Sequence, residues 1–94
     1  MMNMYNPPHP GHLVRETMEE LGLSARQLAL ALDVAPTTLQ RLVNCQSDIS
    51  SEMAIRLAEV IGSSPEVWLS LQCKYDLWQA RNRVDVSRLH RLTA

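Results

Sequence analysis

The stretch that decides the fold is SARQLALALDVAPTTLQRLVN, residues 24–44. Ser24 is a favourable N-cap, and Gln27 stands three residues later, where its side chain can close a capping box. Apolar residues then recur at helical spacing on one face: Leu28, Ala29 and Leu32. The pattern predicts a short helix that ends near Asp33, a residue that tolerates the left-handed backbone of a tight turn better than most.

A second short helix is predicted after this turn. Pro36 suits its first turn, because the missing N–H would be unbonded there. Three residues of this helix would face inward: Leu39, Leu42 and Val43. Four polar residues are left facing outward: Thr37, Thr38, Gln40 and Arg41. Such side chains can exchange hydrogen bonds with base edges and phosphates.

Two short helices joined by a tight turn, with a polar face on the second, are typical of a helix-turn-helix. This motif places its second helix in the major groove of DNA. Spacing alone leaves one alternative open, since a pair of packed helices in an ordinary bundle can have the same polar outer face.

Three more helices are predicted around this pair, which gives an all-α chain of five helices. The first runs from about Pro10 to Leu21 and ends at Gly22. The fourth is capped by Ser50, and the fifth begins at Ser64-Pro65. The abundance of Leu, Ala, Val and Met and the absence of Phe favour helix packing over a β-sandwich.

The 94 residues suffice for one domain. We expect an irregular N-terminal arm over 1–9, where prolines disfavour helix, and a helical domain over 10–83. The tail over 84–94 is compatible with a frayed helix, an added strand or disorder.

The formal net charge is −1, and the charge is unevenly distributed. Residues 1–70 carry four Arg against eight Asp or Glu, whereas residues 71–94 carry five Lys or Arg against two Asp. Nonspecific affinity for DNA comes from neutralising phosphates, and Arg41 is the one basic residue exposed on the second helix of the motif. Such a module would need to dimerise and bind two half-sites at once.

Large apolar residues recur along the fifth helix at alternating steps of three and four: Trp68, Leu71, Tyr75 and Trp78. This is a coiled-coil-like seam, wider than a monomer of this size needs. We interpret it as core or dimer seam, and the alternative is the lining of a small-molecule pocket.

Other features exclude several classes of protein. No apolar run is long enough to span a membrane, and the N-terminus lacks the pattern of a signal peptide. Cys45 and Cys73 lack CxxC spacing, which indicates free thiols in the cytoplasm. His9 and His12 lack a third and fourth metal ligand and are interpreted as part of the N-terminal arm. No catalytic constellation or phosphate loop is present, so neither an enzyme nor a cofactor is predicted.

The chain resembles the HigA-type antitoxins, the plasmid-maintenance antidote branch of the Cro/phage-repressor (XRE-like) helix-turn-helix superfamily. The resemblance runs from His9 to about Trp78. It rests on HPGHLVRE (9–16), LSARQLALALDVAPTTLQRLVN (23–44), ISSEMAIRLAEVIGSSPEVWLSLQ (49–72) and YDLW (75–78). Three departures are visible: Asp33 and Cys45 stand where the superfamily usually has Gly, and Ala35 stands where the recognition helix usually has a Ser cap.

The resemblance implies a lambda-repressor-like bundle that acts in a two-gene toxin–antitoxin module. The protein would bind and block a toxin that cleaves messenger RNA, and a homodimer would repress its own operon at a palindromic operator. The implied base readers are Thr37, Thr38, Gln40 and Arg41. The implied phosphate contacts are Ser24, Arg26 and Asn44, and the fifth helix would supply the dimer seam.

An acidic edge on the first helix, Glu16, Glu19 and Glu20, is compatible with two interpretations. It is either a solvated face or a docking surface for a basic, RNA-cleaving toxin. Two other functions compete with the antitoxin: a stand-alone transcription regulator without a toxin, and a protein-interaction module with a degenerate helix-turn-helix.

Overall fold

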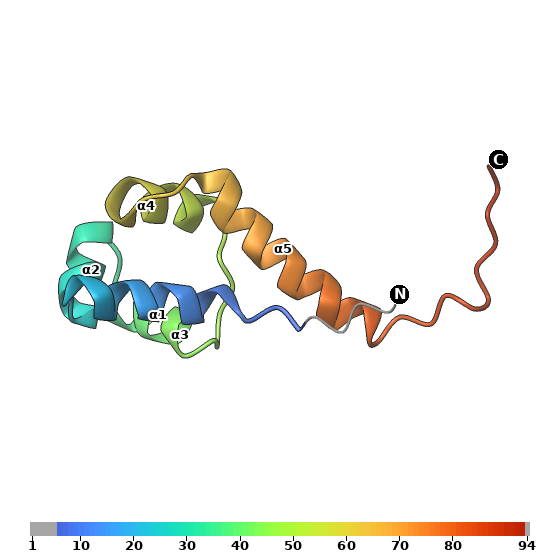
Figure 1. The fold of residues 1–94 in the computed structure, drawn as a ribbon, viewed down its shortest axis with the longest axis horizontal. Coiled ribbons are helices and arrows are strands. Elements are labelled where there is room, and N and C mark those ends of the chain that lie inside the picture. Colours follow the sequence, from blue (N-terminus) through green and yellow to red (C-terminus); the bar gives the residue numbers. More distant parts are fainter. Residues whose placement is uncertain (1–5, 94) are drawn as a thin grey trace.

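The computed structural model describes residues 6–93, which form five α-helices joined by short connections (Figure 1). The helices are α1 (Pro10–Leu21), α2 (Ala25–Leu32), α3 (Pro36–Val43), α4 (Ser51–Ile61) and α5 (Pro65–Arg81). The predictions of an all-α chain and of five helices are therefore confirmed. Within residues 6–93, no helix combines the length and apolar character needed to cross a membrane.

Local sequence signals explain where the helices begin. Ser24 Oγ accepts from the Gln27 N–H at 3.1 Å and Gln27 Oε1 accepts from the Ser24 N–H at 2.8 Å, so the predicted capping box is present. Ser50 and Ser64 cap α4 and α5 in the same way, each accepting an N–H at 3.1 Å. Helix α3 begins at Ala35 without a side-chain cap.

Two non-glycine residues bracket α3 with left-handed backbone. Asp33, in the turn before α3, has φ 58°, and Cys45, just after Asn44, has φ 61°. These are the two positions where the resemblance leads one to expect Gly. The chain therefore keeps the turn geometry and carries the conformational strain of a side chain at positive φ.

One hydrophobic core joins the helices. Helix α1 packs on α3 and α5, α2 packs on α3 and α4, and α4 packs on α5. Each core residue has less than one tenth of its surface exposed: Val14, Met18, Leu28, Ala29, Leu32, Leu39, Leu42, Val43, Ile49, Met53, Ala54, Leu57 and Trp68. The predicted inward faces of α2 and α3 are thus confirmed.

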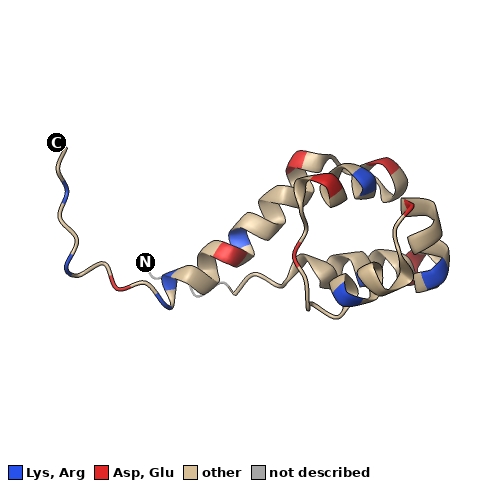
Figure 2. Cartoon of the chain, turned by 180° about the vertical axis from the view of Figure 1, so that it is seen from behind, with Lys and Arg blue, Asp and Glu red and all other residues tan. Residues whose placement is uncertain are grey.

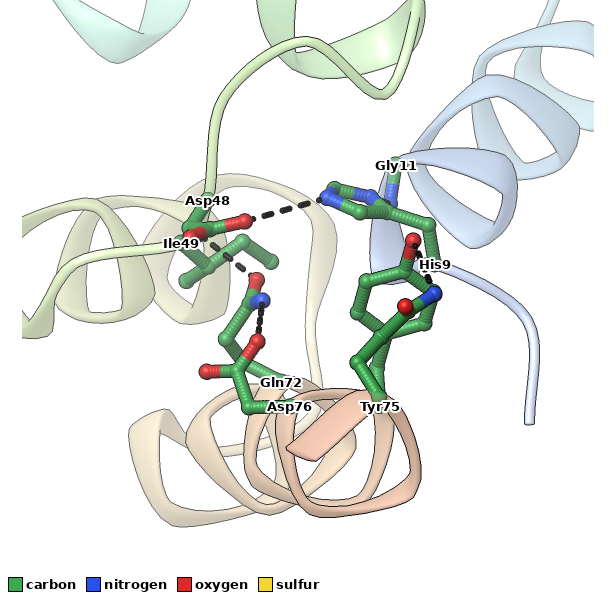
Figure 3. Close-up of polar contacts among 8 residues, drawn as sticks. His9, Gly11, Asp48, Ile49, Gln72, Tyr75 and Asp76 are labelled. Atoms are coloured by element: carbon green, nitrogen blue, oxygen red, sulfur yellow. Dashed lines mark hydrogen bonds and ion pairs between the residues drawn. The ribbon is translucent and has the colours of Figure 1, made fainter. Parts of the chain in front are cut away.

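The start of α1 is tied to the rest of the fold (Figure 3). His9 Nδ1 accepts from the Gly11 N–H at 2.9 Å, and His9 Nε2 lies 3.3 Å from Asp48 Oδ1. Because Nδ1 accepts a hydrogen bond, a neutral His9 carries its hydrogen on Nε2 and donates it to Asp48. The ring also makes an edge contact with Tyr75, with centroids 4.9 Å apart. His9 is therefore a buried helix cap and not part of a free arm; residues 1–5 of that predicted arm lie outside the described residues.

Gly11 sits where α1 crosses the end of α3. A Cβ on Gly11 would collide with the Leu42 carbonyl oxygen, so this position admits no side chain without moving the helix. The close approach brings the first turn of α1 against the last turn of α3.

Residues 82–93 leave the end of α5 and run away from the helices (Figure 1). Residues 84–93 of the predicted tail contain neither helix nor strand, and all of them are exposed. Of the three conformations compatible with the sequence, the frayed helix and the added strand are absent from these described residues.

Candidate nucleic-acid interface

The recognition helix α3 presents its polar residues to solvent. Thr37, Thr38, Gln40 and Arg41 are all exposed. Leu39, Leu42 and Val43, on the opposite side, are at most 4% exposed, which holds the helix against the domain. The arrangement leaves the threonine hydroxyls, the Gln40 amide oxygen and the Arg41 guanidinium able to meet base edges.

The N-terminus of α2 supplies a second polar feature. Ser24 and Arg26 are exposed there. The Ser24 oxygen already accepts from Gln27, while the hydroxyl hydrogen remains able to donate. Backbone N–H groups in the first turn of a helix also attract anions, so this end of α2 suits a phosphate.

Arg56 of α4 fixes the turn between the two helices of the motif. Its Nη1 donates to the Leu32 carbonyl oxygen at 2.7 Å and reaches the Asp33 carbonyl oxygen at 3.3 Å. Its Nη2 donates to Glu52 at 2.9 Å, and this hydrogen bond raises the pKa of Arg56 above its ordinary value. The guanidinium therefore satisfies carbonyl groups at the end of α2 that have no partner within the helix.

Asn44 forms the C-cap of α3 and is exposed. Arg15 Nη2, from α1, donates to the Val43 carbonyl oxygen at 2.7 Å and to Asn44 Oδ1 at 3.0 Å. Sequence reasoning missed the roles of Arg15 and Arg56 at the ends of α3 and α2, because the carbonyl groups that they bind lie more than 20 residues away and leave no local pattern.

The basic residues are spread over the molecule. Figure 2 shows blue segments on the helix-turn-helix, on α4, along α5 and along the tail. The tail residues are Arg83, Arg88 and Arg91. The charge available for DNA on the helix-turn-helix itself is therefore small, as the sequence predicts.

One residue of the predicted dimer seam needs a correction. Trp68 is only 3% exposed, and its Nε1 donates to the Gly62 carbonyl oxygen at 3.0 Å, so it is a core residue of the single chain. Tyr75 packs against His9, and Leu71 lines a cavity of about 280 Å³ with the start of α1. Trp78 is half-buried on the same face, one turn further on. Leu71, Tyr75 and Trp78 are half-buried, so their place in a dimer seam stays a prediction.

A different face of α5 is open. A groove of about 510 Å³ runs along it, lined by Ile49, Leu69, Gln72, Cys73, Asp76, Leu77, Ala80 and Arg83. Leu77 remains 45% exposed there. An apolar row open to solvent therefore runs along Cys73 and Leu77, one step round the helix from the predicted seam, and begins at Leu69, which is half-buried against the core.

The acidic edge of α1 faces solvent. Glu16, Glu19 and Glu20 are exposed, and none forms an ion pair with another residue of the described part of the chain. Leu13 and Leu21 lie on the same helix with 39% and 57% of their surface exposed. No group of three or more potential metal-ligating residues occurs within 6–93.

The chain is similar to known proteins in sequence and in structure. The helix-turn-helix family matches residues 14–68. The chain is 47% identical over 91 residues to the uncharacterised HTH-type transcriptional regulator YddM of Escherichia coli K12, covering 97% of both chains. It is 36% identical over 78 residues to antitoxin HigA-1 of Vibrio cholerae, covering 82% of this chain and 73% of that protein.

The structure is similar to that of antitoxin GraA in complex with its operator. The two share 36% sequence identity and a TM-score of 0.88, over all of this chain and 99% of the other.

Proposed function

Because the chain belongs to the HigA-type antitoxins of the XRE-type helix-turn-helix superfamily, we propose that it represses its own operon as a dimer and neutralises a toxin encoded beside it. The chain is a DNA-binding antitoxin or regulator. The single observation that supports the proposal best is the exposed polar face of α3, in a chain whose structure is similar to an antitoxin bound to its operator.

On the DNA, α3 enters the major groove. Thr37, Thr38, Gln40 and Arg41 read base edges, and Arg41 suits the O6 and N7 of a guanine. The residues in contact with phosphate are Ser24, Arg26 and Asn44. Contacts of this second kind fix the register of the protein on the duplex without reading sequence.

Two copies bind a palindromic operator through the open face of α5. A two-fold interface buries the same patch from both subunits. The apolar groove along Leu69, Cys73 and Leu77 of one subunit would therefore pack against the same groove of the other subunit. Dimerisation doubles the number of phosphate contacts, which compensates for the small positive charge of one helix-turn-helix.

The proposed toxin cleaves messenger RNA and is therefore basic. The acidic edge of α1 suits such a partner, because three carboxylates without ion-pair partners in the described chain attract cationic side chains. Leu13 and Leu21 add apolar surface beside them. Reversing all three charges (Glu16→Lys, Glu19→Lys and Glu20→Lys) should weaken toxin binding at least ~10-fold while leaving the operator affinity intact or raised; unchanged toxin affinity would remove this edge from the proposal.

A stand-alone regulator without a toxin is the second candidate, favoured by the similarity to YddM, which is named as a transcriptional regulator. Co-expression of the protein with the product of the neighbouring reading frame distinguishes the antitoxin from the stand-alone regulator. An antitoxin co-purifies with that product and suppresses messenger-RNA cleavage in a translation extract. Absence of both complex and cleavage would favour the stand-alone regulator.

A further inference from the structure

The end of the recognition helix carries a hydrogen-bond arrangement that does more than cap it. Arg15 Nη2 donates to the Val43 carbonyl oxygen at 2.7 Å and to Asn44 Oδ1 at 3.0 Å. Gln40 Nε2 lies 3.4 Å from the same Asn44 oxygen. Arg15, Gln40 and Asn44 are all exposed, so the arrangement lies at the surface beside the outward face of α3.

These contacts fix the orientation of the Asn44 amide. A guanidinium only donates, and so does the amide nitrogen of Gln40, so the atom of Asn44 that faces them must be the oxygen. The two N–H bonds of Asn44 Nδ2 then point away from Arg15. None of the hydrogen bonds within residues 6–93 uses them.

We propose that Arg15 is a positioning residue for DNA binding, which turns the Asn44 amide so that its N–H bonds face an operator phosphate. The inference rests on the proposed function, in which Asn44 is a phosphate contact. A phosphate oxygen only accepts, so an amide that presented its oxygen would be repelled. Holding the amide in one orientation in the free protein removes an ordering cost from binding.

Gln40 takes part in the same arrangement. Because its Nε2 is directed at Asn44, its Oε1 is left to accept, which suits an exocyclic amine on a base. Arg15 therefore orients the phosphate contact Asn44 directly, and it orients the base reader Gln40 through Asn44. Arg15 itself lies on α1, outside the helix-turn-helix.

The first test is a double-mutant cycle on operator affinity. Arg15→Met and Asn44→Ala should each weaken operator binding about 10-fold, and the double variant should lose little more than either single one. If Arg15 acted as an independent phosphate contact, the two losses would multiply to about 100-fold, which would overturn the inference. Arg88→Met removes the same charge from the exposed tail and serves as the matched control.

The second test separates positioning from a structural role. In Asn44→Asp both side-chain oxygens accept, so the bond with Arg15 is kept and the free protein should unfold at the same or a higher temperature. Operator affinity should nevertheless fall more than ~10-fold, because a carboxylate faces the phosphate. Unchanged operator affinity in Asn44→Asp would show that Asn44 is only a helix cap and would overturn the inference.

The side-chain amide signals of Asn44 in a ¹H–¹⁵N spectrum report the orientation without DNA. They should differ between wild type and Arg15→Met, whereas identical signals would contradict the role of Arg15. Wild-type protein that failed to distinguish operator from scrambled DNA would overturn the proposed function. If the protein does distinguish operator from scrambled DNA, but the affinity losses of Arg15→Met and Asn44→Ala multiply in the double variant, only the role of Arg15 is overturned.

Discussion

Replacing Ala35 with Ser should stabilise the recognition helix. Ala35 is the N-cap of α3, with φ −65° and ψ 143°, and it supplies no side-chain acceptor. Ser24, Ser50 and Ser64 occupy the same position in α2, α4 and α5, and each accepts an N–H at 3.1 Å. A serine hydroxyl at position 35 can accept from the Thr38 N–H in the same way, and it desolvates nothing because position 35 is exposed.

The expected gain in the free energy of unfolding is about 1 kcal/mol, the usual difference between Ser and Ala at an N-cap. For a domain of this size that corresponds to a rise in melting temperature of roughly 4–8 °C. Thermal unfolding followed by circular dichroism measures it, with Ser50→Ala as the reciprocal control, which should lose about 1 kcal/mol. A destabilised Ser50→Ala beside an unchanged Ala35→Ser would refute the argument that α3 lacks only a cap.

Three further predictions follow from the contacts described. Gly11→Ala should destabilise the fold by about 2–3 kcal/mol or more in denaturant titration, because its Cβ would collide with the Leu42 carbonyl oxygen; a smaller loss would mean that α1 can move. Arg41→Ala should cost about 1–3 kcal/mol of operator affinity if it reads a guanine, whereas an equal loss on all sequences would mark it as a phosphate contact. Leu77→Glu should yield monomers in sedimentation and weaken operator binding at least ~10-fold. A dimer that persists in this variant would exclude the open face of α5 as the dimer interface.

Local rules were sufficient to predict the helices. Ser24, Ser50 and Ser64 mark the starts of three helices because an N-cap needs a short side-chain acceptor at one position, which is visible in the sequence. Gly22 marks the end of α1 because the backbone there has φ 68°. The inward faces of α2 and α3 followed from helical spacing for the same reason.

The face of α5 that is open to a partner could not be predicted in this way. Trp68 and Tyr75 recur at seam-like spacing, but periodicity does not say which apolar side is covered by the chain's own residues. Here His9 covers Tyr75, and the core covers Trp68. The packing of α1 on α5 decides which face of α5 stays exposed, and the sequence does not reveal that packing.

Long-range polar contacts were also invisible to the sequence. His9 binds Asp48 across 39 residues, and Arg15 binds the end of α3 across 28 and 29 residues. Neither interaction has a characteristic spacing, since each depends on how the helices pack. Part of what shapes the candidate interface thus lies outside the helix-turn-helix motif.

A dimeric, sequence-specific repressor of its own operon must bind the DNA upstream of its own gene. A gel-shift titration against the DNA upstream of its own gene, at two salt concentrations with scrambled DNA as control, tests it most directly. We expect specific binding to a palindrome that weakens as salt rises, with two subunits per site. Equal binding to both DNAs, or none to either, would contradict it and make the helix-turn-helix a scaffold for a protein partner.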